Sequence, residues 1–357
     1  MPCNRLHEVM AGGSITIGDV AAKAGVSRAT VSRAFTRPNL LTPAVVEQVR
    51  RIADELGYVP NRIARALSTG RFGTIALLVP DIANPFFPPL IRAAQARADA
   101  LGYAVFLGDS DETPDREDRL LAKLAPQVDG FVVASPRLDE ARIRFHAGQK
   151  PTVLINRDIA GVPRVLIDVR GGIEMAITHL VGLGHRRIAY VGGPAASWAN
   201  QQREQAAMAA AQRFGIEELA IPAYRPTYEA GQAAVERLLA AGVSAAIAFD
   251  DIVAQGLVAG LSARGIVIPR DLSIVGFDDV LAATTYPPLT TIDAHCADAG
   301  AAGVELLLEI IETGEKRDAC QIIPTRLVQR ESTGPVATRE AIPGRSPSAG
   351  NRRRSTD

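Results

Sequence analysis

From residue 74 onward, short apolar runs rich in β-branched residues alternate with longer amphipathic stretches. Runs of the first kind predict strands, and the stretches between them predict helices. The predicted strands are residues 74–79, 104–107, 130–134, 152–155, 187–191, 245–249 and 272–277. The predicted helices include residues 89–101, 172–183, 202–214, 228–240 and 252–264. This alternation predicts an α/β fold of parallel sheets covered by helices, and the length favours two such sheets side by side.

Residues 15–60 have a helical pattern instead. Thr16 is a candidate N-cap for a first helix with apolar Val20, Ala21 and Ala24, and Gly25 can adopt the positive φ that ends a helix. A second helix, Arg28–Thr36, is predicted to start after Ser27, to bury Val31 and Phe35, and to present Arg28, Ala29, Ser32 and Arg33 outward. A third helix begins at Thr42-Pro43 and has an apolar face formed by Val45, Val49, Ile52 and Leu56. Three short helices with a glycine turn predict a helix-turn-helix head, whose second helix enters the major groove of DNA.

Charge is distributed unevenly along a chain whose formal net charge is zero. Residues 15–71 contain nine Lys and Arg against four Asp and Glu, a net charge of +5 that leaves −5 for the rest. A basic head on a slightly acidic body favours contact between the head and phosphates. The alternative is a solvated basic face without a partner.

Composition narrows the class of protein. Apolar residues make up 47% of the chain, enough for a sizeable core, and no apolar run reaches the ~20 residues of a membrane span. No secretory signal is evident, and Cys3, Cys296 and Cys320 are too widely spaced for a zinc site or disulfide framework. We therefore expect a cytoplasmic protein with no metal. The dinucleotide and P-loop motifs are also missing, so we expect no cofactor.

Polar residues that follow predicted strands are the candidate ligand contacts, because open parallel sheets bind ligands at the carboxyl ends of their strands. They are Asp81, Asn84, Phe86, Phe87, Asn156, Trp198, Arg203, Asp250 and Asp278. Carboxylates and amides bond hydroxyls, arginine donates to oxygens, and aromatic faces pack on the apolar side of a sugar. The set therefore predicts a site for a polyhydroxyl ligand.

Several of these residues also have a purely structural interpretation. Phe87 can belong to the core, and Arg203 can pair with a neighbouring carboxylate. Asp250 and Asp278, and more so Asp251 and Asp279, can cap helices. The sequence leaves these alternatives open.

The helix-turn-helix residues, together with the run Tyr58-Val59-Pro60-Asn61-Arg62-Ile63-Ala64-Arg65-Ala66-Leu67, resemble the LacI/GalR (lactose/galactose repressor) family of bacterial transcription regulators. The resemblance extends to Arg330-Glu331-Ser332-Thr333. It implies a hinge helix behind the head and a periplasmic-binding-protein-like body of two α/β lobes. The resulting organisation is a disordered extension at 1–14, a DNA-binding domain at 15–60, a hinge at 61–71, an effector-binding and dimerisation domain at 72–334 and a disordered tail at 335–357. Lobe crossovers are expected near 160–167, 290–293 and 322–325.

The resemblance also implies roles in DNA binding. Arg28, Ala29 and Arg33 would read base edges, Thr30 and Ser32 would lie near phosphates, and Thr16 and Ser27 would belong to the same interface. In the hinge, the implied contacts are Asn61, Arg62, Ala64, Arg65 and Leu67, with Leu67 as an apolar wedge in the minor groove. Residues 62–68 are too few for a stable isolated helix, so we expect the hinge to order only when it docks. The alternative for Leu67 is a linker side chain with nothing to bury.

In the body, the resemblance assigns the candidate ligand residues to the effector cleft. Departures at Asp293-Ala294-His295-Cys296 leave the identity of the effector open. The tail has no leucine heptads, so a homodimer is expected rather than a tetramer.

The resulting hypothesis is a non-enzymatic transcription regulator, by family default a repressor. It would bind a pseudo-palindromic operator in the bacterial nucleoid under control of a small effector, for which we expect a carbohydrate. Two rivals are a solute-binding protein, which would need a signal peptide and no head, and a sugar-acting α/β enzyme, which would need a nucleophile, metal or cofactor cradle.

Overall fold

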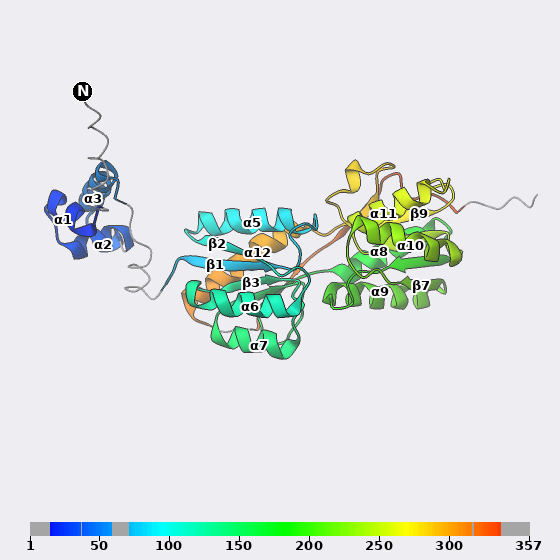
Figure 1. The fold of residues 1–357 in the computed structure, drawn as a ribbon, viewed down its shortest axis with the longest axis horizontal. Coiled ribbons are helices and arrows are strands. Elements are labelled where there is room, and N and C mark those ends of the chain that lie inside the picture. Colours follow the sequence, from blue (N-terminus) through cyan, green and yellow to red (C-terminus); the bar gives the residue numbers. More distant parts are fainter. Residues whose placement is uncertain (1–14, 37, 59–70, 316–317, 337–357) are drawn as a thin grey trace, which may run out of the picture.

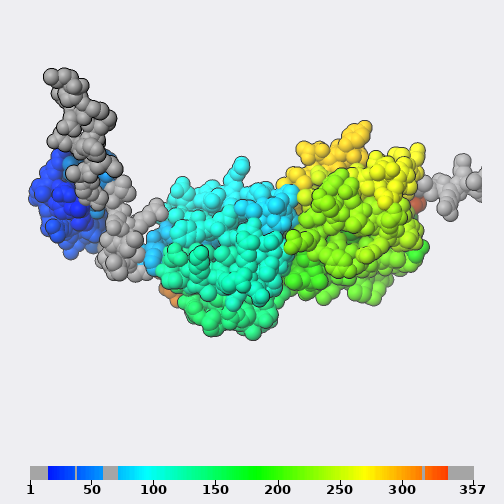
Figure 2. Space-filling model, viewed as in Figure 1, coloured from blue at the N-terminus to red at the C-terminus, as the bar shows by residue number. Residues whose placement is uncertain are grey.

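The computed structural model describes residues 15–36, 38–58, 71–315 and 318–336. They form a helical head and a body of two α/β lobes (Figure 1). The space-filling view shows the two lobes in contact side by side (Figure 2). Among the described helices, none is both long and apolar enough to cross a bilayer.

The head consists of α1 (Ile17–Ala24), α2 (Arg28–Thr36), the 3-10 turn η1 (Pro38–Leu40) and α3 (Pro43–Leu56). Thr16 and Asp19 form a capping box at the start of α1, and Gly25 ends it with φ 66°. Fully buried Val20, Val31 and Val49 join the three helices in one core.

Two details of the head differ from expectation. Phe35 is only partly buried, and Ala34 takes the inward position on α2. On α3, Val46 is buried and Val45 only partly. A core this small accommodates the smaller side chain, while Phe35 packs at its margin beside Tyr58 with the rings 6.1 Å apart.

The first lobe is a six-stranded parallel sheet in the order β11-β5-β4-β3-β1-β2. Its strands are β1 (Thr74–Val79), β2 (Ala104–Asp109), β3 (Phe131–Ala134), β4 (Thr152–Ile155), β5 (Arg164–Ile167) and β11 (Cys320–Ile323). Its helices are α5 (Phe87–Ala100), α6 (Pro114–Leu124), α7 (Glu140–Gln149) and α12 (Cys296–Thr313), with a 3-10 turn η2 (Ala125–Gln127). Helices α5 and α12 pack together on one face, and α6 and α7 lie on the other (Figure 1).

The second lobe repeats this plan in the order β12-β10-β9-β8-β6-β7, with only β12 antiparallel. Its strands are β6 (Arg187–Val191), β7 (Glu217–Ile221), β8 (Ala245–Ala248), β9 (Ser273–Asp278), β10 (Thr290–Asp293) and β12 (Arg326–Val328). Its helices are α8 (Val169–Gly182), α9 (Trp198–Phe214), α10 (Tyr228–Ala240) and α11 (Asp251–Ser262), with a 3-10 turn η3 (Ala282–Thr284). Helices α8 and α9 pack together, as do α10 and α11.

Central strands are apolar throughout because both of their faces are covered. In β1, Ile75, Leu77 and Val79 face one hydrophobic cluster, while Ala76 and Leu78 face another. This two-sided burial is typical of parallel sheets. It explains why continuous apolar runs predicted these strands.

The chain passes between the lobes three times, after β5, after β10 and after β11. The first two passages follow directly after the ranges 160–167 and 290–293 expected from the sequence, and the third lies within 322–325. Residues 290–293 themselves form β10, which pairs with β9 and β12 in the second lobe. Helix α9 also begins earlier than the expected residue 202, because Ser197 caps it by accepting a hydrogen bond from the Asn200 amide.

Candidate DNA-binding head and inter-lobe cleft

Helix α2 presents the side chains that the sequence assigned to base reading. Arg28, Ala29 and Arg33 are exposed, whereas Thr30 and Ser32 are half-buried. The Ser27 hydroxyl caps α2 by accepting from the Thr30 amide at 3.1 Å. The helix therefore offers two guanidinium groups and one methyl group to a surface ligand.

The other predicted DNA contacts divide into two groups. Thr16 is exposed at the start of α1, where its hydroxyl donates to Asp19 at 2.7 Å. The hinge positions Asn61, Arg62, Ala64, Arg65 and Leu67 lie outside the described residues.

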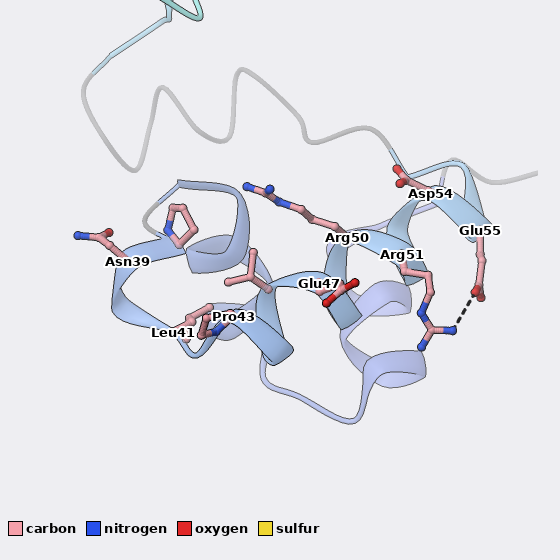
Figure 3. Close-up of a pocket in the computed structure, with 10 residues that line it drawn as sticks. Asn39, Leu41, Pro43, Glu47, Arg50, Arg51, Asp54 and Glu55 are labelled. Carbon is pink, nitrogen blue, oxygen red and sulfur yellow. Dashed lines mark hydrogen bonds and ion pairs between the residues drawn. The ribbon is translucent and has the colours of Figure 1, made fainter.

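A groove also crosses the head between η1 and α3 (Figure 3). Its lining mixes apolar Leu41 and Val46 with charged side chains, among them Arg51 and Glu55, which pair at 3.4 Å. No described residue predicted to contact DNA lines it.

Between the lobes lies a cavity of only about 30 Å³. Seven of the predicted ligand residues line it: Asn84, Phe86, Phe87, Asn156, Arg203, Asp250 and Asp278. They come from both lobes and follow β1, β4, β6, β8 and β9, so the cavity lies at the carboxyl ends of parallel strands.

Two predicted ligand residues do not line this cavity. Asp81 accepts a hydrogen bond from the Ala83 amide at 2.8 Å and so shapes its own loop. Trp198 is the first residue of α9 and is half-buried outside the lining.

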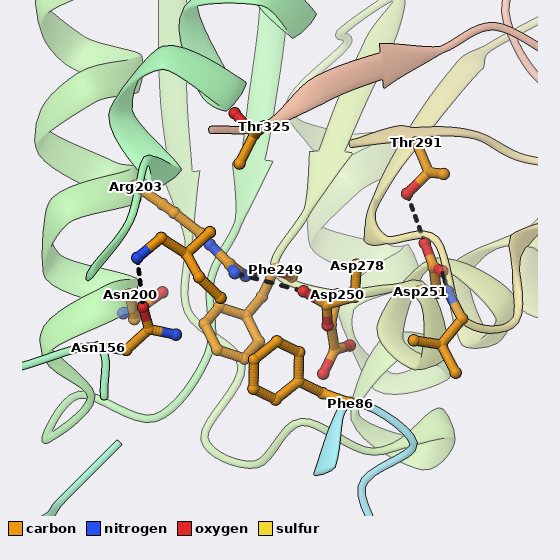
Figure 4. A network of polar contacts seen from close by, with 12 residues as sticks. Phe86, Asn156, Asn200, Arg203, Phe249, Asp250, Asp251, Asp278, Thr291 and Thr325 are labelled. Atoms are coloured by element: carbon orange, nitrogen blue, oxygen red, sulfur yellow. Dashed lines mark hydrogen bonds and ion pairs between the residues drawn. The ribbon is translucent and has the colours of Figure 1, made fainter. Parts of the chain in front are cut away.

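Arg203 lies at the centre of the polar network (Figure 4). Its side chain is 4% exposed and its Nη2 lies 3.5 Å from Asp278 Oδ1. Nη1 donates to the Phe249 carbonyl, and the guanidinium carbon lies 3.6 Å from the centre of the Phe277 ring. Arg203 thus forms the structural ion pair that the sequence left open, and it does so in the cavity wall.

Asp250 joins the two lobes. It is the N-cap of α11, accepting from the Val253 amide at 2.9 Å, and it also accepts from Asn84 Nδ2 at 3.1 Å. Asn84 lies in the first lobe and Asp250 in the second, so this buried bond closes the cleft. The capping interpretation of Asp250 and its position in the cleft are both correct.

The alternative in which Asp251 and Asp279 cap helices is not what the structure has. Asp251 is the first residue within α11, and it accepts from the Thr291 hydroxyl at 2.7 Å. Asp279 pairs with Arg330 at 2.7 Å. In each strand-end Asp-Asp pair, β8 or β9 directs the first carboxylate into the cleft, and the second holds a neighbouring segment.

Burial perturbs the carboxylates on the second-lobe side of the cleft. It raises the pKa of Asp250 to about 6 and that of Asp251 to about 7, although hydrogen bonds oppose the shift. Burial also raises the pKa of Asp278 well above its ordinary value, against the attraction of Arg203. The closed cleft therefore contains charge that is expensive to keep out of water.

The sequence interpretation missed several lining residues: Glu112, Ser135, Arg137, Ser197, Ala199, Pro226 and Phe249. Arg137 is buried and donates through Nε and Nη2 to both Glu112 oxygens, at 2.5 and 2.9 Å. Glu112 follows β2 and Arg137 follows β3. The strand-end argument, applied to these two strands as well, would have found both.

Backbone strain gathers at the same strand ends. Glu112, Ser135, Asn156 and Asp278 all line the cavity with positive φ, at 56°, 47°, 54° and 103°. Such conformations are uncommon for residues other than glycine and gather at functional sites. Among the described residues there is no group of three or more His, Cys, Asp or Glu arranged to hold a metal ion.

Two parts of the chain match known protein families. Residues 16–61 match the family of bacterial regulatory proteins, lacI family, and residues 177–333 match a periplasmic binding protein-like domain.

Relatives match over nearly the whole length. The transcriptional regulator DegA of Bacillus subtilis (strain 168) is 34% identical over 335 residues, covering 90% of this chain and 99% of its own. The lac repressor dimer bound to operator and the anti-inducer ONPF is 26% identical with a TM-score of 0.81, covering 90% of this chain and 100% of its own. The complex of the regulator CelR with cellobiose is 32% identical with a TM-score of 0.66, covering 89% and 99%.

Proposed function

This chain belongs to the lacI family of bacterial regulatory proteins and is a DNA-binding transcriptional regulator, and we propose that it represses transcription until a sugar or similar polyol in its inter-lobe cleft changes its affinity for a pseudo-palindromic operator. The observation that carries the effector half is the Asn84–Asp250 bond across a cavity lined by Arg203, Asp278 and phenylalanines. A ligand in this cavity touches both lobes at once. CelR with cellobiose and the lac repressor with ONPF are relatives that support a sugar-like effector.

The cavity is far smaller than a sugar, so binding requires the lobes to separate and close again on the ligand. Separation breaks the Asn84–Asp250 bond and brings water to the perturbed carboxylates. Because the chain crosses between the lobes three times, their relative position is set at three points. A ligand that favours one spacing of the lobes can therefore bias the position of the first lobe, which directly follows the hinge in the sequence.

For the DNA half, we propose that Arg28 and Arg33 bond guanine edges and that Ala29 contacts a thymine methyl. Thr16, Ser27, Thr30 and Ser32 would contact or approach phosphates. The hinge set Asn61, Arg62, Ala64, Arg65 and Leu67 would pair with its copy over the minor groove in a homodimer. Half-sites would then follow the two-fold symmetry of the dimer.

The first experiment selects DNA fragments with the purified full chain and then measures binding to the selected site by fluorescence anisotropy. Arg33→Ala should weaken the binding free energy for that site by about 1–3 kcal/mol and relax the sequence preference at one base pair. Arg144→Ala on α7, which removes an exposed arginine paired with Glu140, is the control and should change nothing. Failure to select any palindromic sequence would refute the operator proposal.

The second experiment repeats the binding measurement with a panel of sugars. We expect at least one to shift operator affinity by a coupling of about 1–3 kcal/mol. We propose that the cleft binds this sugar without converting it, and that the protein acts in the bacterial cytoplasm. Turnover of a bound sugar would instead support the enzyme alternative.

A further inference from the structure

We propose that the cleft accepts an uncharged polyhydroxyl effector and rejects the phosphorylated or carboxylated form of the same sugar. This inference rests on the proposed sugar-binding function. It follows from how the two arginines in the cavity wall are already paired, and from the carboxylates that surround them.

Arg137 is the arginine of the first lobe. Its Nε and Nη2 form a side-on pair with both oxygens of Glu112, and Nη1 donates to the Ser135 carbonyl at 2.6 Å. Side-chain exposure is 4% for Arg137 and 10% for Glu112. This fork is the geometry with which arginine recognises a carboxylate or phosphate, and here the chain's own carboxylate fills it.

Arg203 is the arginine of the second lobe. Its Nη1 and Nη2 are engaged by the Phe249 carbonyl and by Asp278, and its planar group stacks on Phe277. Its buried Nε has no hydrogen-bond partner among the described residues. An unpaired N–H of this kind suits a hydroxyl oxygen of a ligand.

The charges around the cavity also oppose an anion. The lining contains two arginines but three carboxylates, those of Glu112, Asp250 and Asp278. A fourth, Asp251, is buried directly behind them. Even where burial keeps Asp278 protonated, Glu112 and Asp250 balance the two arginines, so an anionic ligand would enter a poorly hydrated site that has no surplus cation.

The same carboxylates favour a neutral polyol. Ionised oxygens only accept hydrogen bonds, and hydroxyl groups can donate to them. The rings of Phe86, Phe87 and Phe249 supply an apolar surface in the same cavity. The site thus offers acceptors, the unpartnered Arg203 Nε and aromatic faces, while each of its two arginines already pairs with a carboxylate.

The test is calorimetric titration of the full-length protein with matched pairs: ribose and ribose 5-phosphate, glucose and glucose 6-phosphate, and cellobiose and cellobionate. The neutral member of at least one pair should bind, and its anionic partner should bind at least about 100-fold more weakly. An anionic member that binds as tightly as its neutral partner overturns this inference and leaves the proposed function intact. If no sugar of either kind binds, the proposed function itself fails, and this inference fails with it.

A variant pair tests the role of the Glu112–Arg137 bond. Glu112→Gln preserves shape but releases the charge of Arg137, and should improve the affinity for the anionic member relative to the neutral one by about 10-fold or more. Glu140→Gln removes an exposed carboxylate that pairs with Arg144 on the surface of the same lobe, and should leave the ratio unchanged. An unchanged ratio in Glu112→Gln overturns the role of this pair. If that variant does not fold, the wild-type titrations still decide the proposal.

Discussion

Replacing Asp250 with asparagine tests whether the closed cleft costs the protein stability. Asparagine has the shape of a protonated aspartic acid and serves equally well as the N-cap of α11. The change removes one buried charge from the cleft; the Val253 amide keeps its acceptor, whereas Asn84 loses its own, as it also does when Asp250 is protonated. At low pH, where Asp250 is protonated, the variant and the wild type should therefore have similar stability.

The size of the effect follows from the pKa of Asp250, which burial raises from 3.8 to about 6. The native carboxyl binds its proton more tightly than the unfolded one, so the free energy of unfolding falls as pH rises from about 4 to about 6. A shift of about two pKa units corresponds to about 3 kcal/mol. Asp250→Asn should escape this loss and become more stable than the wild type by up to that amount near neutral pH.

The assay is denaturant unfolding of the effector-free protein at several values between about pH 4.5 and pH 7.5. The fluorescence of Trp198, the only tryptophan in the chain, reports on the second lobe beside the cleft. Asp271→Asn is the control, because Arg270 holds the pKa of this exposed carboxyl at about 2 and its titration lies below the range. If Asp250→Asn and the wild type lose stability in parallel across the range, the electrostatic reasoning for the cleft is refuted.

Further variants at three positions test other parts of the molecule. Arg203→Ala leaves the buried Asp278 carboxylate without its ion-pair partner and should lower the unfolding free energy of the second lobe by about 3–5 kcal/mol in the same assay. Arg203→Lys should lose the effector response before it loses stability. An unaltered unfolding curve for the alanine variant would contradict the pairing. Thr16→Ala removes the capping box and should lower the stability of the head by about 1 kcal/mol, measured as faster hydrogen exchange of the α1 amides. Unchanged exchange would contradict the stabilising role of this cap. Leu67→Ala should weaken operator binding in mobility-shift assays far more than binding to random DNA, and equal losses would remove the wedge proposal.

Local patterns along the sequence were sufficient to predict the helices of the head and the more apolar strands of the body. Capping by Thr16 and the left-handed Gly25 delimit α1, because both act within a few residues of the helix they bound. The central strands are recognisable because they are buried on both faces and therefore apolar throughout. The sequence interpretation did not assign β5, β7, β10, β11 and β12. Strands β7, β11 and β12 lie at sheet edges and lack this signal, and β5 and β10 are interior strands of only four residues each.

For the cleft, the strand-end rule identified the edge of the sheet but not which side chains reach the cavity. Asp81 lies after β1 as Asn84 does, yet it bonds its own loop, while Asn84 reaches Asp250. Glu112 and Arg137 follow β2 and β3, so the strand-end rule covers them, but it does not show that they pair with each other, because these strands flank β1 on opposite sides.

The order of amino acids by itself determined the helical head, the alternation of strands and helices, and the strand ends where polar groups gather, since these depend on neighbours within a few residues. Only the tertiary structure decided which carboxylate meets which arginine, that Asp250 joins the lobes, and that the space between them is closed. The arginine–carboxylate pairs depend on which strand ends lie side by side within each lobe, and the closed cleft depends on how the three chain crossings place the two sheets against each other. Contacts between residues 25, 75 and 166 positions apart leave no local pattern.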